Sequence, residues 1–294
     1  MENDIKKILL ELQIIQESSL EKYFPRTRDN ENISVMRCRK SEVIFLENCD
    51  HVDNLYYEQK DQLSYWNQDT YEKAKLDTYN DDIRRSDYIK SYIKNKKWVD
   101  IGTGIGGILD INKTLASEIH AVEPQAYCQK IIAERGYKIV SNAAELPQIF
   151  FDTATLFHVF EHMKNPLTSL KVIYEKIKQG GHLIIEVPHA KDALISWFKL
   201  EDFKKFTFWS EHLILHTRES LRKFVEAAGF IVESIEGVQR YPLANHLYWL
   251  SEKKPGGHEK WGQFSNPSLN NEYANALAKL DMTDTLLLFA RKDK

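Results

Sequence analysis

The sequence of 294 residues is poor in several features that would each define a class of protein. It has three cysteines, Cys38, Cys49 and Cys128, which form no close pair and no metal-ligand spacing. This argues against a disulfide-stapled secreted fold and a structural zinc site, so we expect no bound metal and a reducing, cytoplasmic location. The net charge of −3 provides no basic field that would attract nucleic acid.

Long apolar runs are missing as well. The N-terminal segment MENDIKKILLELQII mixes charged residues among its apolar ones, and no run reaches the length that spans a membrane. We therefore expect no signal peptide and no membrane insertion. Residues 4–20 place apolar side chains at helical spacing, which predicts a helix that packs on its own domain or, alternatively, joins two copies as a homodimer.

What is present is a glycine-rich stretch, KWVDIGTGIGG, at 97–107. An apolar run that ends in glycines indicates a buried parallel strand turning sharply into a helix, where a ligand can lie directly on the backbone and face the helix amides. The stretch also fits the dinucleotide pattern GxGxxG through Gly102, Gly104 and Gly107. It therefore predicts a binding site for a nucleotide-containing cofactor.

The next apolar run, EIHAVEP, helps to identify this cofactor. It carries Glu123 near its end, twenty-one residues after Gly102, where a carboxylate can accept hydrogen bonds from both ribose hydroxyls of an adenosine moiety. This suits NAD and S-adenosylmethionine equally. Asp100, directly before the first glycine, would help to hold a cationic ligand that carries an amino acid, and this favours S-adenosylmethionine.

The order of predicted elements indicates an α/β fold. A helix over 82–95 leads into strands that alternate with helical segments, and this alternation predicts a mainly parallel sheet covered on both faces. A further helix is expected from the N-cap Thr217 to the stop at Gly229. Strands are predicted at 98–101, 118–122, 137–140, 151–157, 182–187, 229–237 and 283–292.

Five motifs in order over residues 85–235 resemble class I S-adenosylmethionine-dependent methyltransferases: VDIGTGIG, VEP, NAAELP, FHVFEH and QGG. The resemblance implies a Rossmann-like seven-stranded sheet with helices on both faces, S-adenosylmethionine as cofactor and S-adenosylhomocysteine as product. It places the glycine loop at the methionine part of the cofactor, Glu123 at the ribose, and His158 near the sulfonium. The cofactor contacts that it implies are Asp100, Gly102, Thr103, Gly104, Glu123, Pro124, Asn142, Ala143, Phe157 and His158.

Three regions are expected on this basis. Residues 1–80 form an N-terminal helical and irregular extension that covers the substrate, with one short strand in SEVIFLE. Residues 81–240 form the cofactor-binding core. Residues 241–294 contain an insertion over the active site and the last core strand, which pairs with the strand before it as an antiparallel edge. An aromatic-rich insert over 189–215 and the insertion are expected to border the acceptor.

The segment WSEHL, at 209–213, resembles a tyrosine-x-Glu-His-Leu segment of the sugar C-methyltransferases of deoxysugar biosynthesis. The resemblance implies that His212, oriented by Glu211, is the general base, and a carboxylate beside the imidazole would raise its basicity. His158 is the other catalytic candidate. RCRKSEVIFLE, with YYE after it, resembles the zinc-binding entry region of those enzymes, but only Cys38 remains and Ser41 stands at a ligand position. The substrate contacts we expect are Tyr57, Trp209, Asn245 and His246.

The leading hypothesis is therefore a methyltransferase that acts by O- or C-methylation on a small-molecule or glycan acceptor, such as a nucleotide sugar or a residue of a surface polysaccharide. A phenolic or quinone-precursor acceptor is the alternative, because FHVFEHMKNP and GGHLII also resemble that branch. Two further alternatives are a methyltransferase-like protein that binds a partner without catalysis and an NAD-dependent oxidoreductase.

Overall fold

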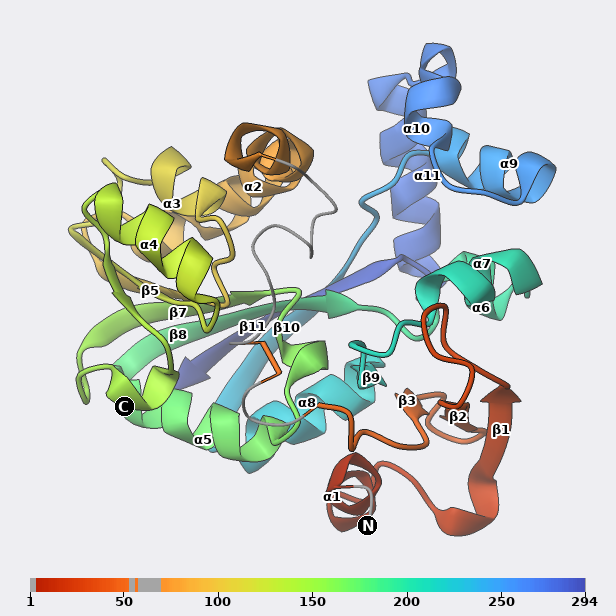
Figure 1. The fold of residues 1–294 in the computed structure, drawn as a ribbon, viewed down its shortest axis with the longest axis horizontal. Coiled ribbons are helices and arrows are strands. Elements are labelled where there is room, and N and C mark those ends of the chain that lie inside the picture. Colours follow the sequence, from red (N-terminus) through yellow and green to blue (C-terminus); the bar gives the residue numbers. More distant parts are fainter. Residues whose placement is uncertain (1–3, 53–55, 58–69, 294) are drawn as a thin grey trace.

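The computed structural model describes residues 4–52, 56–57 and 70–293 (Figure 1). Its centre is a seven-stranded sheet in the order β10-β11-β8-β7-β4-β5-β6. Strands β4 to β8 pair in parallel, whereas β11 is antiparallel to both β8 and β10. This confirms the predicted seven-stranded α/β fold and the antiparallel edge. The strands are β4 (Lys97–Ile101), β5 (Glu118–Val122), β6 (Lys138–Val140), β7 (Phe151–Phe157), β8 (Ile177–Pro188), β10 (Phe230–Val238) and β11 (Thr285–Lys292).

Successive side chains of the central strands enter two separate hydrophobic cores. Trp98, Ile184 and Leu287 belong to one core, while their chain neighbours Val99 and Ile185 belong to the other. This follows from the alternation of side chains along a strand, and it explains why these strands are apolar throughout rather than at every second residue. Both faces of the sheet must therefore be covered by helices.

Figure 1 shows α2, α3 and α4 on one side of the sheet and α5 and α8 on the other. Helix α8 begins where the sequence predicts, because Thr217 and Ser220 form a reciprocal capping box, and Gly229 beyond its end has a φ of 101°. Helix α2 begins well before the predicted residue 82, after its N-cap Thr70. The helices are α2 (Tyr71–Ile93), α3 (Gly107–Ile111), α4 (Ala126–Glu134), α5 (Pro166–Lys176) and α8 (Arg218–Ala227).

The N-terminal region differs from the expected helical and irregular extension. Its helix α1 (Asp4–Glu11) is shorter than predicted, and the strand predicted in SEVIFLE joins a four-stranded antiparallel sheet in the order β1-β2-β3-β9. The fourth strand comes from the insert after β8, and such a long-range pairing leaves no local signal in the sequence. The strands are β1 (Leu20–Phe24), β2 (Val35–Cys38), β3 (Ile44–Leu46) and β9 (Ile214–Leu215).

The two inserts are mainly helical. Helices α6 (Ala193–Ser196) and α7 (Glu201–Thr207) precede β9, and three α-helices lie between β10 and β11. In Figure 1 the small sheet and the helices of both inserts lie to the right of the central sheet. Across the described ranges, no helix combines the length and the apolar character needed to cross a membrane. The helices of the second insert are α9 (Leu243–Glu252), α10 (Gly257–Lys260) and α11 (Pro267–Lys279).

Candidate active site

A cavity of about 950 Å³ lies at the carboxyl ends of the parallel strands. Its wall combines the loops after β4, β5, β6 and β7 with α2, the N-terminal region and the insert before β11. Asp100, Trp209 and Glu211 are not part of its lining. The other residues predicted from the sequence line it: Tyr57, Gly102, Thr103, Gly104, Glu123, Pro124, Asn142, Ala143, Phe157, His158, His212, Asn245 and His246.

The glycine loop forms the turn between β4 and α3. Gly102 and Gly104 both have positive φ values, 71° and 56°, which glycine adopts without strain. A Cβ on Gly102 would also collide with the side chain of Val159 from the loop after β7. The backbone amide of Gly104 donates a hydrogen bond of 2.8 Å to the carboxyl group of Glu123. The glycines therefore bring two strand ends together at one side of the cavity.

Glu123 is buried at the end of β5, with 4% of its surface exposed. It accepts hydrogen bonds from the amides of Gly104 at 2.8 Å and Gln125 at 3.0 Å. Burial, with a smaller contribution from the nearby Asp100, raises its pKa to about 7 against the effect of these two bonds. Donors such as ribose hydroxyls would stabilise its ionised form.

Asp100 lies behind the loop and accepts a hydrogen bond of 2.6 Å from the hydroxyl of Thr155. Burial raises its pKa to about 7. Asp82 of α2, which the sequence analysis did not single out, lines the cavity, and burial raises its pKa to about 6. A cationic ligand beside these acids would favour their ionised forms. The carboxyl groups of Asp82, Asp100 and Glu123 therefore fit an S-adenosylmethionine molecule.

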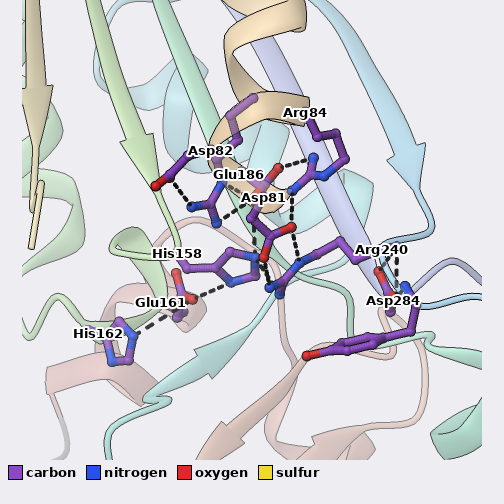
Figure 2. Close-up of polar contacts among 11 residues, drawn as sticks. Asp81, Asp82, Arg84, His158, Glu161, His162, Glu186, Arg240 and Asp284 are labelled. Carbon is purple, nitrogen blue, oxygen red and sulfur yellow. Dashed lines mark hydrogen bonds and ion pairs between the residues drawn. The ribbon is translucent and has the colours of Figure 1, made fainter. Parts of the chain in front are cut away.

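A buried network of charges fixes α2 against the ends of β7 and β8 (Figure 2). Glu186 at the end of β8 is fully buried and accepts hydrogen bonds from Arg84 at 2.7 Å and Arg85 at 2.8 Å. Although burial opposes it, the charge of Arg85 is the leading cause that holds the pKa of Glu186 well below its usual range. Arg240, from the loop after β10, pairs with Asp81 of α2. Sequence reasoning missed this network, because the charges of α2 and Glu186 are about 100 residues apart.

His158 stands where this network meets the cavity. Its Nδ1 lies 3.1 Å from Glu161 and its Nε2 lies 3.1 Å from Arg240 (Figure 2). Glu161 is also fully buried, and the hydrogen bond with His158 together with the charge of His162 lowers its pKa to about 2, although burial alone would raise it. Sequence analysis identified His158 but not its partners.

The surroundings of His212 correct one expectation. The carboxylate that lies beside its ring is Glu161, whereas the carboxylate of Glu211 accepts a hydrogen bond of 3.3 Å from Tyr56. Glu161 does raise the pKa of His212, as a carboxylate should, but burial and the neighbouring His162 outweigh it and lower the pKa to about 3. The expected gain in basicity is therefore wrong, because the partial burial of the imidazole among protein groups disfavours its charged form.

The opposite wall belongs to the insert before β11. His246 of α9 lies 2.6 Å from the hydroxyl of Tyr273, and burial lowers its pKa to about 4, so its ring is neutral. Trp249 packs edge-to-face on Phe203 of α7, and both line the cavity. Trp209 contacts the cavity indirectly, through the guanidinium of Arg28 that lies 4.3 Å above its ring. Polar and aromatic groups therefore face the glycine loop across the cavity.

Comparison with known proteins agrees with this geometry. A family model described as a methyltransferase domain matches residues 78–235, which is more than half of the chain. Among solved structures, an S-adenosylmethionine-dependent methyltransferase from Archaeoglobus fulgidus has a TM-score of 0.50 and 20% identity, over 76% of this chain and 95% of that one. Another from Thermotoga maritima, described as a possible histamine N-methyltransferase, has a TM-score of 0.50 and 21% identity, over 76% and 94%.

No curated protein is similar enough in sequence to match the chain. At these identities the solved structures establish the shared fold, and the family model establishes the kind of enzyme. The chain therefore belongs to the methyltransferase domain family, and its fold is shared with S-adenosylmethionine-dependent methyltransferases of known structure.

Proposed function

We propose that this methyltransferase transfers a methyl group to a hydroxyl of a sugar, carried on a nucleotide or in a surface polysaccharide. The observation that carries the proposal is a single cavity of about 950 Å³ that joins the glycine loop to a wall of polar and aromatic side chains. Ligand pockets commonly measure about 300–1,000 Å³, so this one has room for a cofactor together with a small acceptor. Aromatic faces beside polar groups suit a sugar ring.

In this proposal the cofactor lies along the carboxyl ends of β4 to β7. Gly102, Thr103 and Gly104 hold its methionine part, with Asp100 behind them, and Glu123 with Pro124 holds the ribose. Asn142 and Ala143 border the adenine, while Phe157 and His158 border the sulfonium. S-adenosylmethionine supplies an electrophilic methyl group, so the remaining task of the protein is to position the acceptor and manage its proton.

The acceptor is proposed to lie between His212 and the insert before β11. Tyr57, Asn245 and His246 line that part of the cavity and would hydrogen-bond to its hydroxyls. His212 would accept a hydrogen bond from the reacting hydroxyl, with Glu211 and Trp209 fixing the segment that carries it. We expect the enzyme to act in the cytoplasm, where its three free, buried cysteines stay reduced.

The weak basicity of His212 favours O-methylation over C-methylation. A carbon nucleophile must lose its proton before it can attack, and this requires a strong base. A hydroxyl oxygen already has a lone pair and can lose its proton as the new bond forms. An imidazole whose pKa is lowered by burial suits the second case better.

A phenolic or quinone-precursor acceptor is the second candidate, and one observation favours it. Three aromatic side chains, Phe203, Phe206 and Trp249, line the cavity, and Trp249 contacts both phenylalanine rings. A flat aromatic ring could pack among them. Such an acceptor would need fewer hydrogen bonds than Asn245 and His246 can offer.

The two candidates can be separated by measuring the release of S-adenosylhomocysteine with a panel of nucleotide sugars and a panel of phenols. We expect turnover with a sugar and, by NMR of the product, a methyl group on oxygen. Glu123→Ala, assayed at a cofactor concentration below its raised dissociation constant, serves as the control with weakened cofactor binding. Turnover with phenols alone would overturn the proposal in favour of the second candidate, and a methyl group on carbon would overturn the choice of oxygen.

A further inference from the structure

Three potential metal ligands meet at the acceptor side of the cavity: Glu161, His162 and His212. One carboxylate oxygen and one ring nitrogen from each histidine all lie within 4.8 Å of one another. Glu161 and His162 belong to the short 3₁₀ helix η4 (Phe160–His162) after β7, whereas His212 comes from the insert after β8. The ring centroids of the two histidines are 5.0 Å apart.

Backbone contacts hold the two segments together. The amide of Leu213 donates a hydrogen bond of 2.9 Å to the carbonyl of Glu161, so the chain on either side of the cluster is fixed. The ring of Trp209 packs edge-to-face on both histidines, at centroid distances of 6.0 Å and 5.4 Å. The three ligands therefore have a rigid support, which a metal site requires.

The hydrogen bond of His162 determines which of its ring nitrogens could bind a metal. Its Nδ1 lies 2.8 Å from the backbone carbonyl of Glu211, and a carbonyl can only accept, so Nδ1 must carry the proton. The lone pair is then on Nε2, which lies 3.8 Å from a carboxylate oxygen of Glu161. Metal-binding histidines usually have this arrangement, with the second nitrogen donating to a carbonyl or carboxylate.

Among the described residues, Glu161 and His212 each have a buried polar atom with no hydrogen-bond partner. Glu161 is completely buried, and its Oε2 has no hydrogen-bond partner among the described residues, while its Oε1 is bonded to His158. The Nδ1 of His212 is likewise without a partner in the described ranges. Buried polar atoms are almost always satisfied, so two exceptions in one cluster point to a missing ligand.

We infer that Glu161, His162 and His212 bind a divalent transition-metal ion, with zinc as the best match. Two imidazoles and one carboxylate form the ligand set of many catalytic zinc sites, which keep a further position open. Both histidines line the cavity, so the open position would face the acceptor. Zinc–ligand bonds of about 2.1 Å require ligand atoms to be roughly 3.4 Å apart, so the side chains need to close by at most about 1.5 Å.

The ion would lie where the proposed function places the reacting hydroxyl, and its role toward the acceptor rests on that proposal. The ion, in place of His212, would contact the hydroxyl oxygen and orient this oxygen toward the methyl group. The binding of the ion itself depends only on the three side chains. A failure to methylate sugars and a failure to bind metal are therefore separate results.

The test uses the full chain without an affinity tag, stripped of metal by a chelator and titrated with Co²⁺, followed by competition with Zn²⁺. We expect one ion per chain and the visible absorption of a four- or five-coordinate Co²⁺ site that zinc abolishes. His162→Ala, His212→Ala and Glu161→Gln should each weaken binding by more than about a hundredfold, since even the loss of a supporting residue costs 10- to 100-fold.

His258→Ala is the matched control, because His258 lines the same cavity from α10 but lies outside the cluster. Its affinity for Co²⁺ should equal that of the unmodified protein. Glu161→Gln keeps the shape of the side chain, so it remains informative where the alanine variants fail to fold. A titration that shows only hydrated Co²⁺, or a loss of affinity as large in His258→Ala as in His212→Ala, would overturn the inference.

Discussion

Glu123→Ala tests the proposed cofactor site most directly. The carboxyl group of Glu123 joins the glycine loop to the end of β5 through its bonds with the amides of Gly104 and Gln125. It is proposed to accept hydrogen bonds from the ribose hydroxyls. The substitution removes this acceptor without changing the backbone of β5, so the expected defect is in binding rather than in folding.

The magnitude follows from the protonation state of the carboxyl group. A pKa of about 7 means that about half of the free protein carries an ionised Glu123 at neutral pH, and ionising the rest costs about 0.4 kcal/mol. Hydrogen bonds to charged groups contribute about 1.5–3 kcal/mol. The dissociation constant of S-adenosylhomocysteine should therefore rise roughly ten- to a hundredfold.

Titration calorimetry with S-adenosylhomocysteine measures this change, and circular dichroism confirms that the variant folds. Glu118→Ala is the matched control, because Glu118 lies at the amino end of β5, away from the cavity, and pairs with Lys138 there. The affinity of the Glu118→Ala variant for S-adenosylhomocysteine should be unchanged. A folded Glu123→Ala variant whose affinity stays within about twofold of the original would refute the ribose assignment.

Four further predictions follow from the buried ionisable groups. Because Asp100 and Glu123 both have a pKa of about 7 and a cationic ligand favours their ionised forms, S-adenosylmethionine, whose sulfonium is positively charged, should bind more tightly as the pH rises from about 6 to 8, releasing protons that calorimetry in two buffers detects. Burial raises the pKa of Asp192 from 3.8 to about 8, so the folded chain holds a proton that the unfolded chain releases, and the free energy of unfolding falls as the pH rises between these two values. Asparagine carries no such proton, so in urea unfolding Asp192→Asn should gain stability relative to the unmodified protein between pH 5 and pH 8. Glu186→Gln removes the buried carboxylate that Arg84 and Arg85 share and leaves them only Asp81 and Asp82 as partners, so it should lower the free energy of unfolding by about 3 kcal/mol, and an unchanged urea midpoint would contradict this. His212→Ala should lower turnover while the affinity for S-adenosylhomocysteine stays the same, and equal turnover would remove His212 from the acceptor site.

The central sheet could be predicted because its signals are local. The central parallel strands β4 and β7 are short apolar runs, and most of their side chains on both faces are buried. Both ends of α8 are likewise determined by nearby residues: Thr217 and Ser220 cap its start, and Gly229 follows its end. In the small N-terminal sheet only β3 was predicted. Strand β9 was missed because it pairs with β3 about 170 residues away, whereas β1 and β2 (LEKYF and VMRC) are short and show no clear apolar alternation.

The same distinction applies to the site. The glycine loop and Glu123 follow a spacing that the fold itself imposes, so the sequence was sufficient to find them. Arg240 and Asp82 carry no such spacing. Each lies on an element that was predicted only as a helix or a loop, and only the folding of α2 over the strand ends brings them to the cavity.

His212 shows where adjacency in the sequence misleads. Glu211 and His212 are neighbours in a turn, and neighbouring side chains leave such a backbone in different directions, one toward Tyr56 and one toward the cavity. The carboxylate that meets the imidazole belongs to Glu161, brought there by the amide of Leu213 that bonds to its carbonyl. The Glu-His pair in the sequence therefore marks a candidate site. The carboxylate that contacts the histidine is determined instead by the packing of η4 against the insert. It follows that Glu161→Gln should shift the NMR signals of the His212 ring more than Glu211→Gln does. Equal shifts in the two variants would contradict this.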